Sequence, residues 1–137
     1  MLEGKRVLVI DGDIQSVCPS FDALHDCGVL VTLVKTAEDA LRCLQESEFD
    51  LLVTEVRLPQ MNGYDFCKTL SQCERLAQIP IVAASINPFV NSLNIARCRN
   101  VVDFLPKPFT AEEMIQTLKR VFSGEPGRFD CLTRRDG

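Results

Sequence analysis

The chain has 137 residues, of which 46% are hydrophobic and 25% charged, a composition typical of one globular domain with a single well-filled core. Its net charge of −4 provides no global field that would recruit nucleic acid or an anionic membrane surface. The longest apolar runs have the length of strands, well short of the roughly 20 residues that a helix needs to span a bilayer, which argues against a membrane protein.

Apolar runs suited to buried strands alternate along the chain with segments of helical period, a pattern typical of a doubly wound parallel sheet. The first strand is predicted at Arg6–Ile10 and the second at Val29–Val34. Gly28 ends the helix between them, whose inner face comprises Ile14, Val17, Phe21 and Leu24. Pro19 cannot donate to a helical ladder, so it either lies in the first turn after a Ser16 cap or bends the helix.

The middle of the chain predicts a helix, a strand and a second helix. Thr36 begins a near capping box, and the helix that follows faces inward with Ala37, Ala40, Leu41 and Leu44. A strand is predicted at Phe49–Glu55. The next helix begins near Gly63 and presents four residues to the core, Phe66, Cys67, Leu70 and Cys73.

The last predicted elements are two strands, at Pro80–Ser85 and Val101–Leu105, each followed by a helix. The first of these helices lies somewhere within Pro88–Arg97. The second is capped by Thr110 and has an inner face of Ala111, Met114, Ile115, Leu118 and Phe122. A break at Gly124–Gly127 indicates that one domain covers residues 4–123 and that residues 124–137 form a tail or linker.

Seven cysteines raise the question of disulfides or a metal site. Their number is odd, no Cys-x-x-Cys pair occurs, and His25 is the one histidine, so zinc and iron–sulfur spacings are absent. The seven are Cys18, Cys27, Cys43, Cys67, Cys73, Cys98 and Cys131, and we expect most of them to pack as reduced thiols at core-facing helical positions.

Four fragments end in residues that carry chemistry. Asp50–Glu55 delivers a carboxylate to the tip of a strand, just before a turn that contains Pro59 and Asn62-Gly63. A second apolar run ends in acid at Val7–Asp13, and Ile81–Ser85 ends in a hydroxyl. Asp103–Phe109 supplies a lysine directly before a proline.

In this order and spacing, the fragments strongly resemble the receiver domain of bacterial two-component response regulators. The resemblance implies an α/β fold, a doubly wound five-stranded parallel sheet of the flavodoxin or CheY type, with strand order 2-1-3-4-5. In that topology Asp11, Glu55, Ser85 and Lys107 converge on a shallow pocket at one edge of the sheet.

In that family an aspartate at the position of Glu55 accepts a phosphoryl group, and an acidic pair after the first strand helps to hold Mg²⁺. Asp11 matches the first acid of the pair, and Gly12 stands where the second contributes a metal ligand. Ser85 matches the hydroxyl that hydrogen-bonds the phosphoryl group, and Lys107 matches the lysine that pairs with it.

Both departures weaken the expected phosphoryl transfer. One extra methylene moves the Glu55 carboxylate by roughly 1.5 Å, where a displacement of about 1 Å costs on the order of 100-fold in rate. Gly12 has no side-chain oxygen, and strand alternation makes Asp13 an uncertain substitute. We therefore expect a poor phosphoacceptor with no cofactor and no metal site, Mg²⁺ binding only weakly through Asp11, Asp13 and Glu55 if it binds.

The longer acid also has a constructive interpretation. An ion pair between Glu55 and Lys107, with a hydrogen bond to Ser85, would partly imitate an acyl phosphate and favour an active-like state. Phe104 occupies the family's aromatic switch position, and it packs inward without an unsatisfied donor because it has no phenolic hydroxyl. The family holds the bond before Pro108 in the cis form.

Each residue also has a plain structural interpretation. Asp11 can simply cap a helix, Ser85 can be a turn residue, and Lys107-Pro108-Phe109 can persist as a turn in a domain without chemistry. The four fragments together favour the site.

The leading hypothesis is an atypical receiver that signals by protein–protein contact and is not an enzyme. The resemblance implies that a histidine kinase or an output domain binds the surface of the fourth helix, fifth strand and fifth helix, about residues 89–123, with a homodimer left open. No nucleic acid or membrane partner is expected. The N-terminus lacks a signal-peptide core, which favours the cytoplasm.

Two other functions compete with this hypothesis. One is a working Mg²⁺-dependent phosphoacceptor that uses Asp13 as the replacement ligand. The other is a flavin or nucleotide binder, which the absence of a Gly-rich loop after the first strand disfavours.

Overall fold

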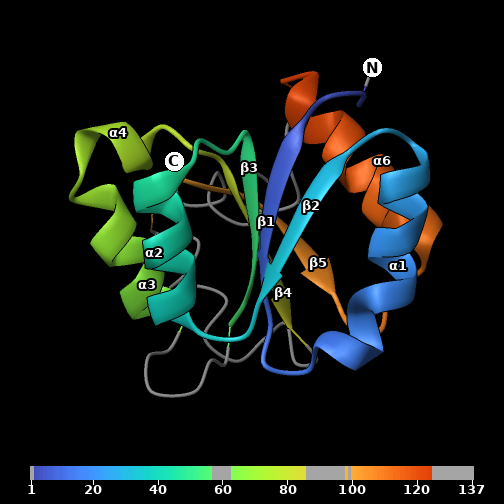
Figure 1. Cartoon of the computed structure of the whole chain (residues 1–137), viewed down its shortest axis with the longest axis horizontal. Helices are drawn as coiled ribbons and strands as arrows, with labels where there is room; N and C mark the ends of the chain where they lie inside the picture. Colours follow the sequence, from blue (N-terminus) through green and yellow to red (C-terminus); the bar gives the residue numbers. More distant parts are fainter. Residues whose placement is uncertain (1, 57–62, 86–97, 99, 125–137) are drawn as a thin grey trace, which may run out of the picture.

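A computed structural model describes residues 2–56, 63–85, 98 and 100–124 of the chain (Figure 1). Five parallel strands form one sheet in the order β2-β1-β3-β4-β5, which confirms the predicted topology. The strands are β1 (Arg6–Ile10), β2 (Leu30–Val34), β3 (Leu51–Glu55), β4 (Ile81–Ser85) and β5 (Val101–Pro106). Each predicted strand is present, with starts that differ by at most two residues.

Helices cover both faces of the sheet (Figure 1). The described helices are α1 (Ile14–Asp26), α2 (Ala37–Glu46), α3 (Gly63–Ser71), α4 (Glu74–Ala77) and α6 (Ala111–Phe122). Figure 1 shows α1 and α6 on one face and α2, α3 and α4 on the other. The helix predicted within residues 88–97 lies outside the described residues.

The alternation of strand side chains explains why the strands are continuous apolar runs. In β1, Val7 and Val9 pack into the cluster that contains the α1 and α6 residues Phe21, Leu24, Met114 and Leu118. Leu8 and Ile10 point to the opposite cluster, which contains the α2 and α3 residues Ala40, Leu44, Phe66 and Leu70. Because successive residues of a strand face opposite sides, a sheet covered on both faces needs apolar residues at every position.

Local capping signals position the helices as predicted. The Thr36 hydroxyl accepts the N–H of Asp39, and Thr110 forms a full capping box with Glu113 at the start of α6. Gly28 follows α1 at a φ of +86°, where the N–H of Gly28 bonds the carbonyl of His25 and the N–H of Val29 bonds that of Leu24. This Schellman motif needs the left-handed conformation that glycine adopts without steric cost.

One alternative and one prediction about helices are excluded. Helix α1 begins at Ile14, so Pro19 lies inside it, and the alternative of a first turn after a Ser16 cap does not hold. Cys73 is exposed and is the N-cap of α4, because α3 already ends at Ser71. The four-residue helix α4 is only one turn long, too short to leave a periodic signal in the sequence.

The cysteines are less buried than predicted. Among the described cysteines Cys67 is buried, Cys43 and Cys98 are half-buried and pack against the same core cluster, and Cys27 and Cys73 are exposed, so the expectation of core packing holds for three of the six described cysteines. Burial raises the pKa of the Cys67 thiol, which therefore remains protonated and unreactive at neutral pH. In the described part of the chain, no helix combines the length and the apolar character needed to cross a membrane.

Candidate functional site

The site lies where three parallel strands end. Asp11 directly follows β1, and its N–H extends the ladder by donating to the carbonyl of Val34 at 3.0 Å. Glu55 is the last residue of β3, and Lys107 follows the last residue of β5. Because the carboxyl ends of parallel strands meet at one edge of the sheet, residues distant in the sequence become neighbours there.

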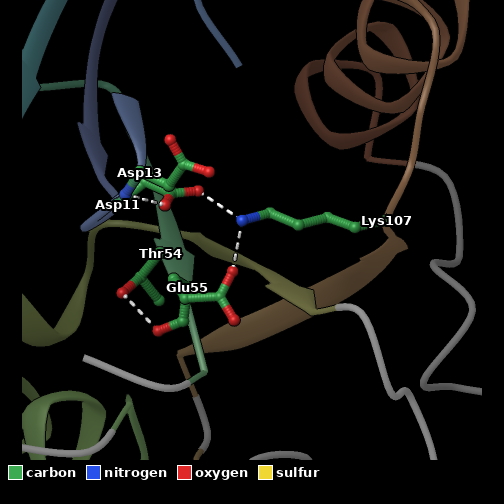
Figure 2. Close-up of polar contacts among 5 residues, drawn as sticks. All are labelled: Asp11, Asp13, Thr54, Glu55 and Lys107. Carbon is green, nitrogen blue, oxygen red and sulfur yellow. Dashed lines mark hydrogen bonds and ion pairs between the residues drawn. The ribbon is translucent and has the colours of Figure 1, made fainter. Parts of the chain in front are cut away.

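The Lys107 ammonium bridges the two carboxylates (Figure 2). Its Nζ lies 2.5 Å from Oδ2 of Asp11 and 2.5 Å from Oε2 of Glu55. The side chains of Lys107, Asp11 and Glu55 are only 12%, 6% and 11% exposed, so water screens these contacts weakly. The predicted convergence of these three residues, and the predicted Glu55–Lys107 ion pair, are present.

The carboxylates keep Lys107 charged. Burial by itself lowers the pKa of Lys107, but the hydrogen bonds and negative charges of Asp11 and Glu55 outweigh burial and raise the pKa above its ordinary value. At neutral pH the bridge therefore contains a full ammonium charge between two carboxylates.

The turn after β1 supplies backbone contacts to this bridge. The second oxygen of Asp11, Oδ1, accepts the N–H of Asp13 at 2.8 Å. Gly12 lies between them and has no side-chain oxygen. The Asp13 residue is exposed. The Asp11 carboxylate thus receives one hydrogen bond on each oxygen, from Asp13 and from Lys107.

The other predicted site residues lie on β4, on β5 and just after it. Phe104 is 5% exposed and packs in the core cluster on the α2 and α3 side of the sheet, inward as predicted. The Lys107–Pro108 peptide bond is cis. Ser85 ends β4 in register with Pro106, and its side chain lies outside the described part of the structure.

The sequence analysis missed the contacts of two buried polar residues, Thr54 and Asp103. The buried Thr54 hydroxyl donates to the carbonyl of Glu55 at 3.2 Å (Figure 2). Asp103 is fully buried, accepts the N–H of Phe104 at 2.7 Å through Oδ1, and pairs with Nη2 of Arg120 on α6 at 3.1 Å. A threonine and an aspartate inside otherwise apolar strands were the available signals, since buried polar groups need partners.

The described acidic groups do not form a cluster of three or more metal ligands. Within the residues that the structure describes, no three side chains of Asp, Glu, His or Cys are grouped so that they could hold a metal ion. The space between the Asp11 and Glu55 carboxylates contains the Lys107 amine. The described donor set offers Mg²⁺ the Asp11 and Glu55 carboxylates, which Lys107 already holds, so as it stands it does not fit an ion that takes one or two free carboxylates and completes its octahedron with water.

Comparisons with known proteins agree with this architecture. The sequence profile of the family described as "Response regulator receiver domain" matches residues 7–119. The DNA-binding transcriptional regulator NtrC of Proteus hauseri is 25% identical over 118 residues, which cover 86% of this chain and 24% of NtrC. The chain thus spans about a quarter of the length of that curated relative.

Two solved structures are similar over most of the chain. The chemotaxis response regulator CheY4 of Vibrio cholerae has a TM-score of 0.78 and 26% identity, covering 85% of this chain and 98% of CheY4. The receiver domain of the sensor histidine kinase PA1611 from Pseudomonas aeruginosa PAO1 has a TM-score of 0.77 and 25% identity, covering 85% of this chain and 96% of that domain. That structure has a magnesium ion coordinated in its active-site cleft.

Proposed function

This chain belongs to the response regulator receiver domain family of two-component signalling, and we propose that it is an atypical member that signals through protein contacts without being phosphorylated in the usual way. The observation that carries the proposal is the bridge between the Asp11 and Glu55 carboxylates. The Lys107 ammonium lies 2.5 Å from an oxygen of each.

The placement of Glu55 supports the first half of the proposal. The attacking carboxylate oxygen must approach the phosphorus atom in line with the leaving group. The extra methylene of glutamate relative to aspartate moves this oxygen by roughly 1.5 Å. Oε2 of Glu55 is moreover held by the Lys107 ammonium. A carboxylate that is both displaced and ion-paired is a poor nucleophile for a phosphoryl group that is itself anionic.

The donor set supports the absence of metal assistance. In a receiver with the full donor set, a bound Mg²⁺ supplies the positive charge that lets a carboxylate approach a phosphoryl group. Here Gly12 offers no side-chain ligand, and Lys107 neutralises part of the charge of Asp11 and Glu55 directly. Asp11, Glu55 and Lys107 instead hold the tips of β1, β3 and β5 together, with Lys107 remaining charged.

The buried Phe104 supports a signalling role for β5. The bridge fixes Lys107, three residues after Phe104, and Phe104 is packed in the core. We propose that this arrangement corresponds to an active-like state. A histidine kinase or an output domain would then bind the surface of residues 89–123, of which 98 and 100–123 are described. On this proposal the domain is not an enzyme and does not contact nucleic acid directly.

Incubation with Mg²⁺ and a small phosphodonor such as acetyl phosphate, followed by intact mass measurement, tests the proposal. We expect no added phosphoryl group on the wild-type chain. The matched positive control is the double variant Gly12→Asp with Glu55→Asp, which restores a metal ligand and the shorter acceptor together and should gain a phosphoryl group. Each single change should restore much less, because metal binding and acceptor placement are coupled.

The competing function has a distinct outcome in the same experiment. If the wild-type chain gains a phosphoryl group on Glu55 or Asp11 and Asp13→Ala abolishes the gain, the chain is a working phosphoacceptor with Asp13 as the replacement ligand. If either single restoring change reaches the level of the double variant, the account of two separate defects is wrong.

A further inference from the structure

We infer that Lys107 is the built-in cation of this pocket: its ammonium occupies the position between Asp11 and Glu55 that a metal ion would need, so the domain supplies its own positive charge there and is independent of divalent cations. This inference deepens the proposed function, because it says what replaces the metal at the same site.

The geometry of the bridge is that of a bound cation. A single positive centre lies 2.5 Å from an oxygen of Asp11 on one strand tip and 2.5 Å from an oxygen of Glu55 on another. Both carboxylates are almost fully buried and would repel each other if nothing positive lay between them. This cation is part of the protein, on a side chain that follows β5, so it does not have to be bound from solution.

The Lys107 ammonium compensates one of the two negative charges that it contacts. Asp11, Glu55 and Lys107 together carry a net charge of −1, and an acid at position 12 would raise the excess to −2. Gly12 adds no charge and no oxygen. The loss of the acid at position 12 and the bridging position of Lys107 are therefore two parts of one arrangement.

The length of Glu55 completes the arrangement. A glutamate reaches farther from the end of β3 than an aspartate does, so its Oε2 meets the same Nζ that contacts Oδ2 of Asp11. While Lys107 contacts both carboxylates, a divalent ion would have to displace its ammonium. Because these groups are buried, water screens the attraction between the ammonium and the carboxylates only weakly. Wild-type chain should therefore bind Mg²⁺ and Mn²⁺ poorly, and removal of the ammonium should leave a cation site.

Metal binding by the wild-type chain and two variants tests this inference without any phosphodonor. Mn²⁺ binding is measured by electron paramagnetic resonance, and thermal unfolding is followed in EDTA and in excess Mg²⁺ for wild type, Lys107→Met and Lys35→Met. We expect Lys107→Met to bind Mn²⁺ at least about tenfold more tightly than wild type and to gain thermal stability with Mg²⁺. Lys35 is an exposed lysine just after β2 at the same edge of the sheet, so Lys35→Met removes the same charge without vacating the bridge.

The wild-type bridge is also observed directly, which keeps the inference testable if Lys107→Met does not fold. The Nζ resonance of Lys107 in a nitrogen-15 spectrum should stay unchanged when Mg²⁺ is added. A shift of that resonance on addition of Mg²⁺ would overturn the inference. So would tight Mn²⁺ binding by wild type, or equal gains in Mn²⁺ affinity in Lys107→Met and Lys35→Met.

Failure here is distinguishable from failure of the proposed function. A wild-type chain that binds Mg²⁺ yet gains no phosphoryl group would contradict the built-in cation and leave the proposed function standing. A chain that is phosphorylated without binding a divalent cation would contradict the proposed function and leave the built-in cation standing.

Discussion

The length of the side chain at position 55 determines which groups the tip of β3 reaches. Glutamate and aspartate carry the same functional group, so the difference between them is one of position. In this structure the added length coincides with a contact between Oε2 of Glu55 and a lysine that also contacts Asp11. Because removal of one partner of a buried ionic group leaves charge uncompensated, loss of Lys107 alone should cost on the order of 3 kcal/mol of stability.

The raised pKa of Lys107 predicts how that stability depends on pH. A lysine in the unfolded chain titrates near about 10.4, and the folded value is higher, so the folded state holds the proton more tightly. The contribution of the bridge is fully present below about pH 10.4 and is lost as the pH rises through the folded pKa.

Urea unfolding from pH 7 to pH 11 measures this dependence. The difference in unfolding free energy between wild type and Lys107→Met should be constant up to about pH 10 and then shrink. Lys35→Met, which removes an exposed lysine, should follow the wild-type profile throughout. A difference between wild type and Lys107→Met that stays constant through pH 11 would show that the bridge does not raise the pKa of Lys107.

Single helices depend on short local signals. Helix α6 supplies Met114 and Leu118 to the core and carries Arg120, the partner of the buried Asp103. Its first turn is closed by a reciprocal pair of bonds, from the N–H of Glu113 to the Thr110 hydroxyl at 3.1 Å and from the N–H of Thr110 to the Glu113 carboxylate at 3.0 Å. Without these bonds, N–H groups at the helix start lose their side-chain acceptors.

Thr110→Ala should therefore lower the free energy of unfolding by about 1 kcal/mol, measured by urea titration. The matched control is Thr69→Ala. Thr69 is an exposed threonine inside α3, whose hydroxyl bonds the carbonyl of Asp65 one turn earlier. Alanine is the better helix former at such an interior position, so the control should change stability by less than about 0.5 kcal/mol. Equal losses in the two variants would show that the cap contributes nothing specific.

Across the whole molecule, two core clusters on opposite faces of one sheet make the fold. The cluster on the α1 side draws residues from Leu2 to Phe122, so the first and last described elements pack together. Helix α6 closes this cluster, and Gly124 follows it at a φ of +75°. We expect the folding unit to end there, and the buried Leu2 lies just before the start of the predicted domain of residues 4–123.

A chain that ends after Gly124 tests this boundary. Its urea midpoint and the slope of the transition should equal those of the full chain, because the slope scales with the surface exposed on unfolding. A chain that ends after Phe109 lacks α6 and should show no cooperative transition. A lower midpoint for the chain that ends after Gly124 would place residues 125–137 in the folding unit.

Much of this molecule follows from local patterns. Continuous apolar runs predict strands buried on both faces, Thr36 and Thr110 predict helix starts, and the order of motifs predicts the strand order of the sheet. Predictions failed where the local pattern was short or ambiguous. Helix α4 has a single turn, and Cys73 continued the period of α3 although that helix had already ended.

The sequence by itself determined which acids and which lysine reach the edge of the sheet, since each ends or follows an apolar run that is visible in the residues. Only the tertiary structure decided that Lys107 contacts Asp11, 96 positions away, and Glu55 at once, and that Asp103 pairs with Arg120. The physical reason is range. Side-chain period and capping are properties of neighbouring residues, whereas an ion pair depends on strand order, on side-chain reach and on how much water the surrounding elements exclude.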